Sequence, residues 1–236
     1  MSNFADKGFV FHNLAAKYLS LLTLALSEPE IINFNLRDYA KGLVEYYNST
    51  IHRVPEDWLS KPINLDEDYS SEEISYIKKV TNGNYVPVVF DGSRCRMMKK
   101  MNEKNITLEK AIKKTFKKLK SFGKTSNHFD SQSRYLQSEF DKLPNLPFWQ
   151  RIRLRYQIKY HNKALKYFER NFLHEDGLFN RPWFKHTVFA SGRFTGYAGQ
   201  NLPGLNEAIE DGSFERFAAW QKIFFKTIER VSKRLD

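Results

Sequence analysis

The chain has 236 residues, of which 41% are hydrophobic and 15% aromatic, which is enough for the core of one large domain and excludes a disordered chain. Lys and Arg number 38 against 27 Asp and Glu, so the net charge is +11, and the single cysteine, Cys95, excludes an internal disulfide. The longest apolar run, around residues 18–26, falls short of the ~18 residues that a membrane-spanning helix needs, so no span is predicted.

Two helices are predicted in the first 60 residues. Apolar side chains recur at helical spacing over residues 9–26, and Pro29 ends the pattern. A second helix is expected to begin after Asn33 or Asn35, either of which can cap it, and to run to about Ile51.

Residues 60–105 contain an acidic patch, Asp66-Glu67-Asp68, followed by turn residues at 81–84. Asn82 and Gly83 favour the turn of a small hairpin. The apolar residues 85–90 predict a short strand, although Pro87 argues against a central position in a sheet.

Long helices are predicted in the second half of the chain. Thr107 is expected to cap a helix from residue 108 to about 122, Gly123 to break or kink it, and a further helix to run from about Asp130 to just before Pro144. Residues 146–173 are expected to form the longest helical segment, with a core face made of Phe148, Ile152, Leu154, Tyr156, Ile158, Leu165, Phe168 and Phe172.

A last helix is predicted over residues 214–235, with Ser213 as its cap. Its apolar stripe is Phe217, Trp220, Ile223, Phe224, Ile228, Val231 and Leu235. Several long helices with short or looped connections predict an all-α fold, an antiparallel four-helix-type bundle with a long irregular loop before the last helices.

Positive charge is concentrated in residues 94–124, which hold twelve Lys or Arg and two acids, Glu103 and Glu109. Such a stretch fits nucleic acid, an anionic membrane surface, an acidic partner or a solvated helix face. No zinc-finger spacing or RNA-binding signature accompanies it. We therefore favour the solvated face and predict no nucleic-acid partner.

The loop over residues 186–204 is the strongest candidate for a functional segment. An apolar run enters it, and Gly192, Gly196 and Gly199 permit tight turns or a close approach of the backbone. Long ordered loops between helices often carry function.

This loop resembles one in the C-terminal helical domain of the transferrin receptor and glutamate carboxypeptidase II family, part of the M28 peptidase group. The match runs without a gap through His186, residues 188–190, Tyr197-Ala198-Gly199 and Pro203-Gly204. The approach, residues 177–184, resembles the family's Gly-Leu-Pro-x-Arg-Pro-aromatic-aromatic, and residues 34–40 resemble the opening of the domain. The Lys- and Asn-rich composition is typical of a fungal member.

The resemblance implies a domain organisation and a function. Residues 1–30 would be the terminal helix of a preceding peptidase-like domain, and residues 31–236 a non-catalytic homodimerisation domain, with 60–105 as its insertion. The partners would be a second copy and the upstream domain. The resemblance places the chain on the lumenal or extracellular side of a single-span type II membrane protein of the secretory pathway or vacuole. Two alternatives stay open: part of an active zinc carboxy- or aminopeptidase, or a sorting receptor without catalysis.

The resemblance also implies site residues. Tyr197 matches a tyrosine that contacts substrate in the carboxypeptidase branch, whereas Gly196 stands where that branch has a lysine, so glutamate specificity is not carried over. Arg193 could compensate, and Gly199 completes the pocket loop. Structural loop residues are His186, Pro182, Trp183, Pro203 and Gly204, with Trp183 expected to fill a core.

No catalytic residue, metal ligand or cofactor is predicted within the chain, and zinc is expected only in the upstream domain. Asn48 and Asn105 begin acceptor sequons for glycosylation, which fit a lumenal location.

Overall fold

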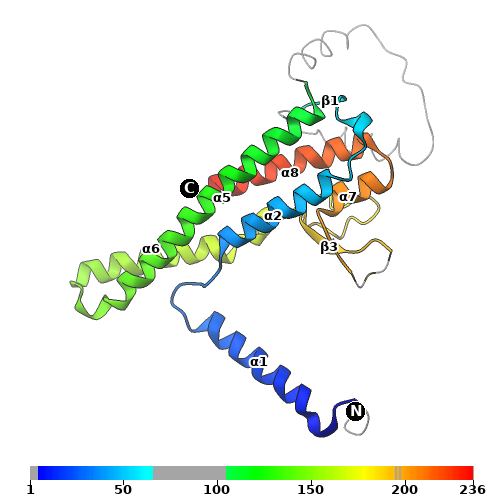
Figure 1. Ribbon diagram of the computed structural model, residues 1–236. Helices are drawn as coiled ribbons and strands as arrows, with labels where there is room; N and C mark the ends of the chain where they lie inside the picture. The colour runs from blue at the N-terminus through cyan, green and yellow to red at the C-terminus, as the bar shows by residue number, and fades with distance from the viewer. Residues whose placement is uncertain (1–4, 66–104, 195, 197, 236) are drawn as a thin grey trace. The chain divides into compact units, whose positions relative to one another are not determined.

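The computed structural model describes residues 5–65, 105–194, 196 and 198–235, and it confirms a mainly helical fold. The described helices are α1 (Val10–Ser27), α2 (Leu36–Ile51), α5 (Leu108–Asp141), α6 (Phe148–Lys166), α7 (Pro203–Glu210) and α8 (Phe214–Leu235) (Figure 1). Short 3₁₀ helices cover Lys7–Phe9, Glu56–Trp58, Leu143–Asn145 and Glu169–Phe172.

Two small antiparallel sheets accompany the helices. β1 (Pro62–Ile63) pairs with β2 (Ile106–Thr107), and β3 (Phe189–Ser191) pairs with β4 (Gly199–Asn201). The first pair joins the two ends of the predicted insertion. The hairpin and strand expected at residues 82–90, and Cys95, lie outside the described residues.

The chain forms two compact units, residues 36–127 with 168–236, and residues 1–35 with 128–167. In the first unit, α2, the first part of α5 and α8 lie side by side (Figure 1). A buried polar triad links these three helices: the Gln221 amide hydrogen-bonds to the Tyr47 hydroxyl at 2.7 Å and to the Thr115 hydroxyl at 2.8 Å. Tyr47 also stacks on Phe224 with 5.4 Å between ring centroids.

α8 follows the prediction closely. Phe217, Phe224, Ile228 and Val231 are almost fully buried, because residues at three- and four-residue spacing share one helix face. The Ser213 hydroxyl accepts a hydrogen bond from the Arg216 backbone N–H at 3.4 Å, as an N-terminal cap does.

α5 is longer than the sequence predicts. It runs without interruption through Gly123, where a break or kink was expected, and its 34 residues make it longer than the segment over 146–173. The Thr107 hydroxyl accepts from the Lys110 N–H at 3.4 Å, as predicted for its start. A glycine in a helix costs only ~1 kcal/mol relative to alanine, and the burial of Leu119 and Phe122 beside Gly123 offsets that cost.

In the second unit, α6 packs on the end of α5 and on the segment before α2. The core consists of Ile31, Leu136, Leu154 and Ile158, with Phe140, Leu143 and Leu146 packed against it. The Asn162 side chain fixes the segment by accepting from the Ile32 N–H at 3.1 Å and donating to the Glu30 carbonyl at 2.6 Å.

α6 differs from the prediction in length and in its faces. It ends at Lys166, and a separate 3₁₀ turn follows at Glu169–Phe172. Of the predicted core face, Leu154, Ile158 and Leu165 are buried, but Phe148, Ile152 and Tyr156 are exposed by 66%, 40% and 74%.

α1 has a wide apolar side and a narrower polar side with Asn13, Lys17, Ser20 and Thr23, and within the described residues it buries none of its side chains. The segment Lys7–Ser27 is long and apolar enough, by length and composition alone, to cross a membrane. The expectation that no segment meets this criterion is therefore corrected. Core helices of soluble proteins and signal sequences meet the same criterion.

Candidate dimer interface and the motif loop

The motif loop, residues 186–204, contains the hairpin formed by β3 and β4, and Arg181 connects this hairpin to α7. Arg181, in the turn before the loop, donates to the Ser191 carbonyl at 3.0 Å and forms an ion pair with Glu207 on α7. Both side chains are largely buried, with 12% and 8% exposed. Burial raises the pKa of Glu207, and the Arg181 guanidinium opposes that rise. The pair therefore fixes the loop to α7 from inside the fold.

A second ion-pair cluster ties the tip of the hairpin to the end of α7. Asp211 contacts Arg193 on one carboxylate oxygen and Arg216 on the other, both at 2.6 Å. The hydrogen bond with Asp211 raises the pKa of Arg193. Arg193, the residue expected to replace the family lysine, therefore has its guanidinium engaged by Asp211.

Of the predicted pocket residues, the structure describes Arg193, Gly196 and Gly199. Gly196 has a φ of 66°, a left-handed conformation that favours glycine, and Gly199 begins β4. Tyr197 lies outside the described residues. Its substrate role stays a prediction.

Of the residues predicted to shape the loop, His186 is hydrogen-bonded within it and Trp183 lies exposed at the surface. His186 accepts from the Val188 and Phe189 backbone N–H groups through Nδ1, at 3.2 and 3.1 Å, which leaves Nε2 to donate to Glu169 at 2.9 Å. Trp183 is 69% exposed, so the expectation that it fills a core is wrong. It lies in a surface turn stabilised by the backbone hydrogen bond from Phe184 to Arg181.

Gly204 lies directly under an indole ring. Pro203 occupies the first turn of α7, and both residues are buried. A Cβ added at Gly204 would come within 2.1 Å of the Trp220 ring. The Pro-Gly pair of the motif therefore lets α7 approach α8 closely.

α6 carries a second apolar face that the sequence prediction merged with the first. At 100° per residue, Trp149, Ile152, Tyr156 and Tyr160 form one stripe, roughly opposite the buried Leu154 and Ile158. Trp149 and Tyr160 are 77% and 78% exposed, and Phe148 extends the stripe at its start. We call these five side chains, Phe148, Trp149, Ile152, Tyr156 and Tyr160, the outer face of α6. The signal was in the sequence: apolar residues occupy two opposite sides of one helix.

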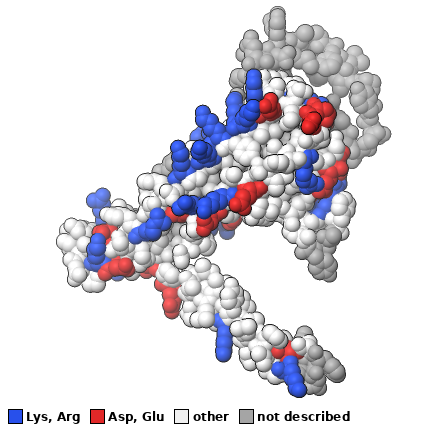
Figure 2. Space-filling model, in the orientation of Figure 1, with Lys and Arg blue, Asp and Glu red and all other residues white. Residues whose placement is uncertain are grey.

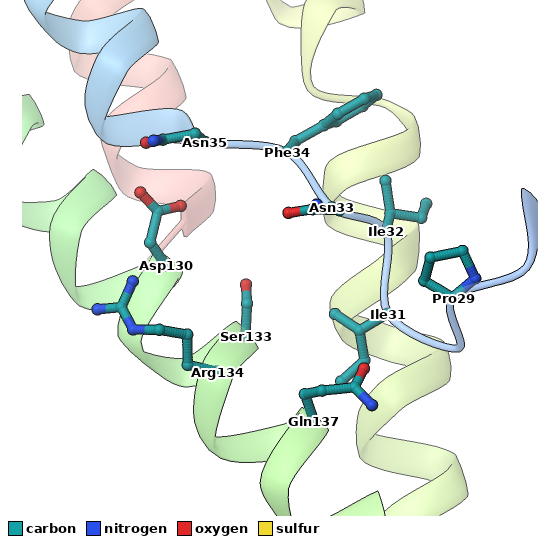
Figure 3. A pocket seen from close by; sticks show the side chains of 10 residues that line it. All are labelled: Pro29, Ile31, Ile32, Asn33, Phe34, Asn35, Asp130, Ser133, Arg134 and Gln137. Atoms are coloured by element: carbon teal, nitrogen blue, oxygen red, sulfur yellow. The ribbon is translucent and has the colours of Figure 1, made fainter. Parts of the chain in front are cut away.

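A crevice of about 400 Å³ lies in the same unit, beneath the segment before α2 (Figure 3). Asp130, Ser133, Arg134 and Gln137 line it from α5. The Ser133 hydroxyl lies 2.6 Å from His161 Nε2, and burial lowers the pKa of that ring, although the charge of Asp130 opposes the shift. The crevice thus has a polar wall.

The described residues fit no metal centre, because no group of three His, Cys, Asp or Glu among them could hold an ion.

Comparisons with known proteins agree with this geometry. Residues 97–236, more than half of the chain, match the model of the transferrin receptor-like dimerisation domain. The chain is similar to "Vacuolar protein sorting-associated protein 70" of Saccharomyces cerevisiae, at 24% identity over 98% of the chain and 23% of that protein. It is also similar to "Probable glutamate carboxypeptidase LAMP1" of Arabidopsis thaliana, at 24% identity over 100% of the chain and 25% of that protein.

The chain therefore spans about a quarter of the length of the curated relatives it matches. The family match covers α5, α6, the motif loop, α7 and α8, and it leaves out α1 and α2. The chain belongs to the transferrin receptor-like dimerisation domain family.

Proposed function

We propose that this chain is the homodimerisation part of a larger transferrin receptor- or glutamate carboxypeptidase-like protein, and that two copies join through the outer face of α6. The observation that carries the proposal is a helix with two apolar faces, one of which packs on α5 while the other is exposed. A soluble monomer rarely exposes a contiguous row of large aromatic side chains, and such a row marks an interaction surface.

The size of the face suits a stable pair. A buried Phe, Tyr or Trp removes ~150–250 Å² from water, so the four aromatic side chains of each copy would bury on the order of 1,000 Å² in a symmetric dimer. That is near the lower limit of a specific interface before the neighbouring residues are counted. A twofold dimer places the same patch of both copies together, so one self-complementary face suffices.

Basic side chains border the outer face of α6 and also lie within it. Arg155 and Arg153 are exposed at its two edges, whereas Lys159 and Lys163 are exposed at helical positions inside the arc of the aromatic row. Interfaces keep charged residues at the solvated edge, so the two arginines fit a rim. The long stems of the two lysines can lie along the apolar side chains while their ammonium groups reach solvent.

For α1 we propose the cover that the family resemblance implies, a preceding peptidase-like domain in the longer protein. The apolar side of α1 exposes large side chains such as Phe11, Leu14 and Leu22, and such a side needs a cover. We further propose that any zinc, and the ligands for it, belong to the part of the protein that this chain does not span. The pairing of Arg193 with Asp211 gives no support to a glutamate-binding role for the loop. The relatives' names, a sorting protein and a probable carboxypeptidase, support a location in the secretory pathway or vacuole.

The test is the mass of the chain in solution, measured by light scattering over a dilution series. The proposal expects a discrete species of twice 27.9 kDa that persists at low micromolar concentration. Association through α1 alone would instead give a broad range of masses that mild detergent disperses. A chain that is monomeric at every concentration would contradict the proposal.

A further inference from the structure

The exposed side of the first half of α5 carries lysine almost to the exclusion of other residues. At 100° per residue, Lys110, Lys113, Lys114, Lys117, Lys120 and Lys124 all fall within an arc of about 120°. All six are exposed, and the opposite arc holds the buried Ala111, Thr115, Leu119 and Phe122. Figure 2 shows basic side chains gathered along this helix. We call these six residues the lysine face.

Acidic side chains neutralise little of this face. In the part of the chain that the structure describes, Glu109 pairs with Lys113, whereas Lys110, Lys114, Lys117, Lys120 and Lys124 take part in no ion pair within 4.0 Å. The nearby acid Glu229 is already engaged by Lys118 and Lys233. Among the residues that the structure describes, these five lysines thus stand along ~21 Å of helix without an ion pair. Their mutual repulsion is a cost that an anionic partner would relieve.

From this arrangement we infer that the lysine face binds the surface of a membrane that contains anionic phospholipids. The face is straight and convex and uses lysine alone, a compact hydrated charge on a long flexible stem. These properties suit many mobile phosphate headgroups on a flat surface. Recognition of single-stranded nucleic acid would call for aromatic side chains on which bases stack, and the exposed arc between Lys110 and Lys124 holds none. A cluster of about four to eight Lys or Arg residues on one side of a helix is typical of proteins that bind anionic lipid headgroups.

The inference does not depend on dimerisation. The lysine face belongs to the unit formed by residues 36–127 and 168–236, whereas the outer face of α6 belongs to the other unit. Loss of one function should therefore leave the other measurable.

The experiment compares binding of the chain to phosphatidylcholine vesicles with and without phosphatidylserine, by co-sedimentation. We expect binding that requires phosphatidylserine and weakens with added salt. The triple variant Lys110→Gln, Lys114→Gln, Lys117→Gln should bind about 100-fold more weakly, because each lysine near such a surface contributes a factor of about five. Any binding through α1, which carries Lys17, should be the same in the wild type and in the triple variant, so the difference between these two proteins isolates the lysine face.

The matched control removes the same charge through Lys41→Gln, Lys142→Gln and Lys185→Gln, three exposed residues outside both the lysine face and the outer face of α6. It should retain wild-type vesicle binding. Circular dichroism should show both variants folded, since every changed side chain is exposed. Absence of binding at low salt, equal loss in the two variants, or tighter binding to a DNA duplex than to the anionic vesicles would each overturn the inference.

Discussion

The Arg181 guanidinium and the Glu207 carboxylate form an ion pair that is almost removed from water, with 12% and 8% of the two side chains exposed. The ion pair joins the turn that precedes the motif loop to α7, the helix that follows the loop in the chain. Arg181→Met should lower the free energy of unfolding by about 3–5 kcal/mol, because it leaves a buried carboxylate without its partner. Urea denaturation measures this.

The double variant Arg181→Met, Glu207→Gln serves as the control. It removes the uncompensated charge and should cost less than Arg181→Met alone. Equal losses in the two variants would show that packing of Arg181, and not its charge, stabilises the loop.

Gly204→Ala should destabilise the chain by about 1–3 kcal/mol, because the new methyl group would overlap the Trp220 ring and force α7 away from α8. Thermal unfolding is the measurement. Gly199→Ala is the matched control, since nothing lies within 4 Å of its added Cβ, and it should change stability by less than about 0.5 kcal/mol. The prediction fails if the two glycine variants melt together.

Gln221→Leu should cost about 1–3 kcal/mol, because Gln221 is fully buried and satisfies the hydroxyl groups of Tyr47 and Thr115. In a double-mutant cycle, adding Tyr47→Phe to Gln221→Leu should cost less than Tyr47→Phe does in the wild type. Strict additivity in urea denaturation would argue against a shared network.

Stability should fall between pH 7 and pH 5, in part through His161. Burial lowers the pKa of His161 in the folded state, so the unfolded chain binds its proton first as pH falls. The contribution is present above the unfolded pKa of ~6.5 and is lost as pH falls toward the folded pKa. His161→Gln should flatten the dependence of unfolding free energy on pH in this window. An unchanged slope would exclude His161 as its source.

The sequence predicts helix type and position well where periodicity and caps agree. α2 and α8 have a single apolar stripe each, and Ser213 caps α8 as expected. Gly123 misled the prediction because local propensity favours a break, whereas packing of the neighbouring Phe122 decides the outcome. Tertiary contacts of this kind cannot be read from a window of sequence.

The site could be predicted only in outline. The motif residues located the loop, but the partners that hold it, Glu207 for Arg181 and Asp211 for Arg193, lie 26 and 18 residues away along the chain. In α6, periodicity finds apolar positions without saying which side meets the core. Both sides of α6 fit a core face, so Tyr156 was assigned to the wrong one.

The central claim is that two copies meet through the outer face of α6, and light scattering of a variant of that face tests it most directly. The variant Trp149→Ser, Tyr156→Ser, Tyr160→Ser changes only exposed side chains, and Trp183→Ser with Phe194→Ser removes comparably exposed aromatic residues from the other unit. The account predicts that the α6 variant has the monomer mass of about 28 kDa and that the control remains a dimer like the wild type. An α6 variant that stays dimeric at the concentrations where the wild type is dimeric would contradict it.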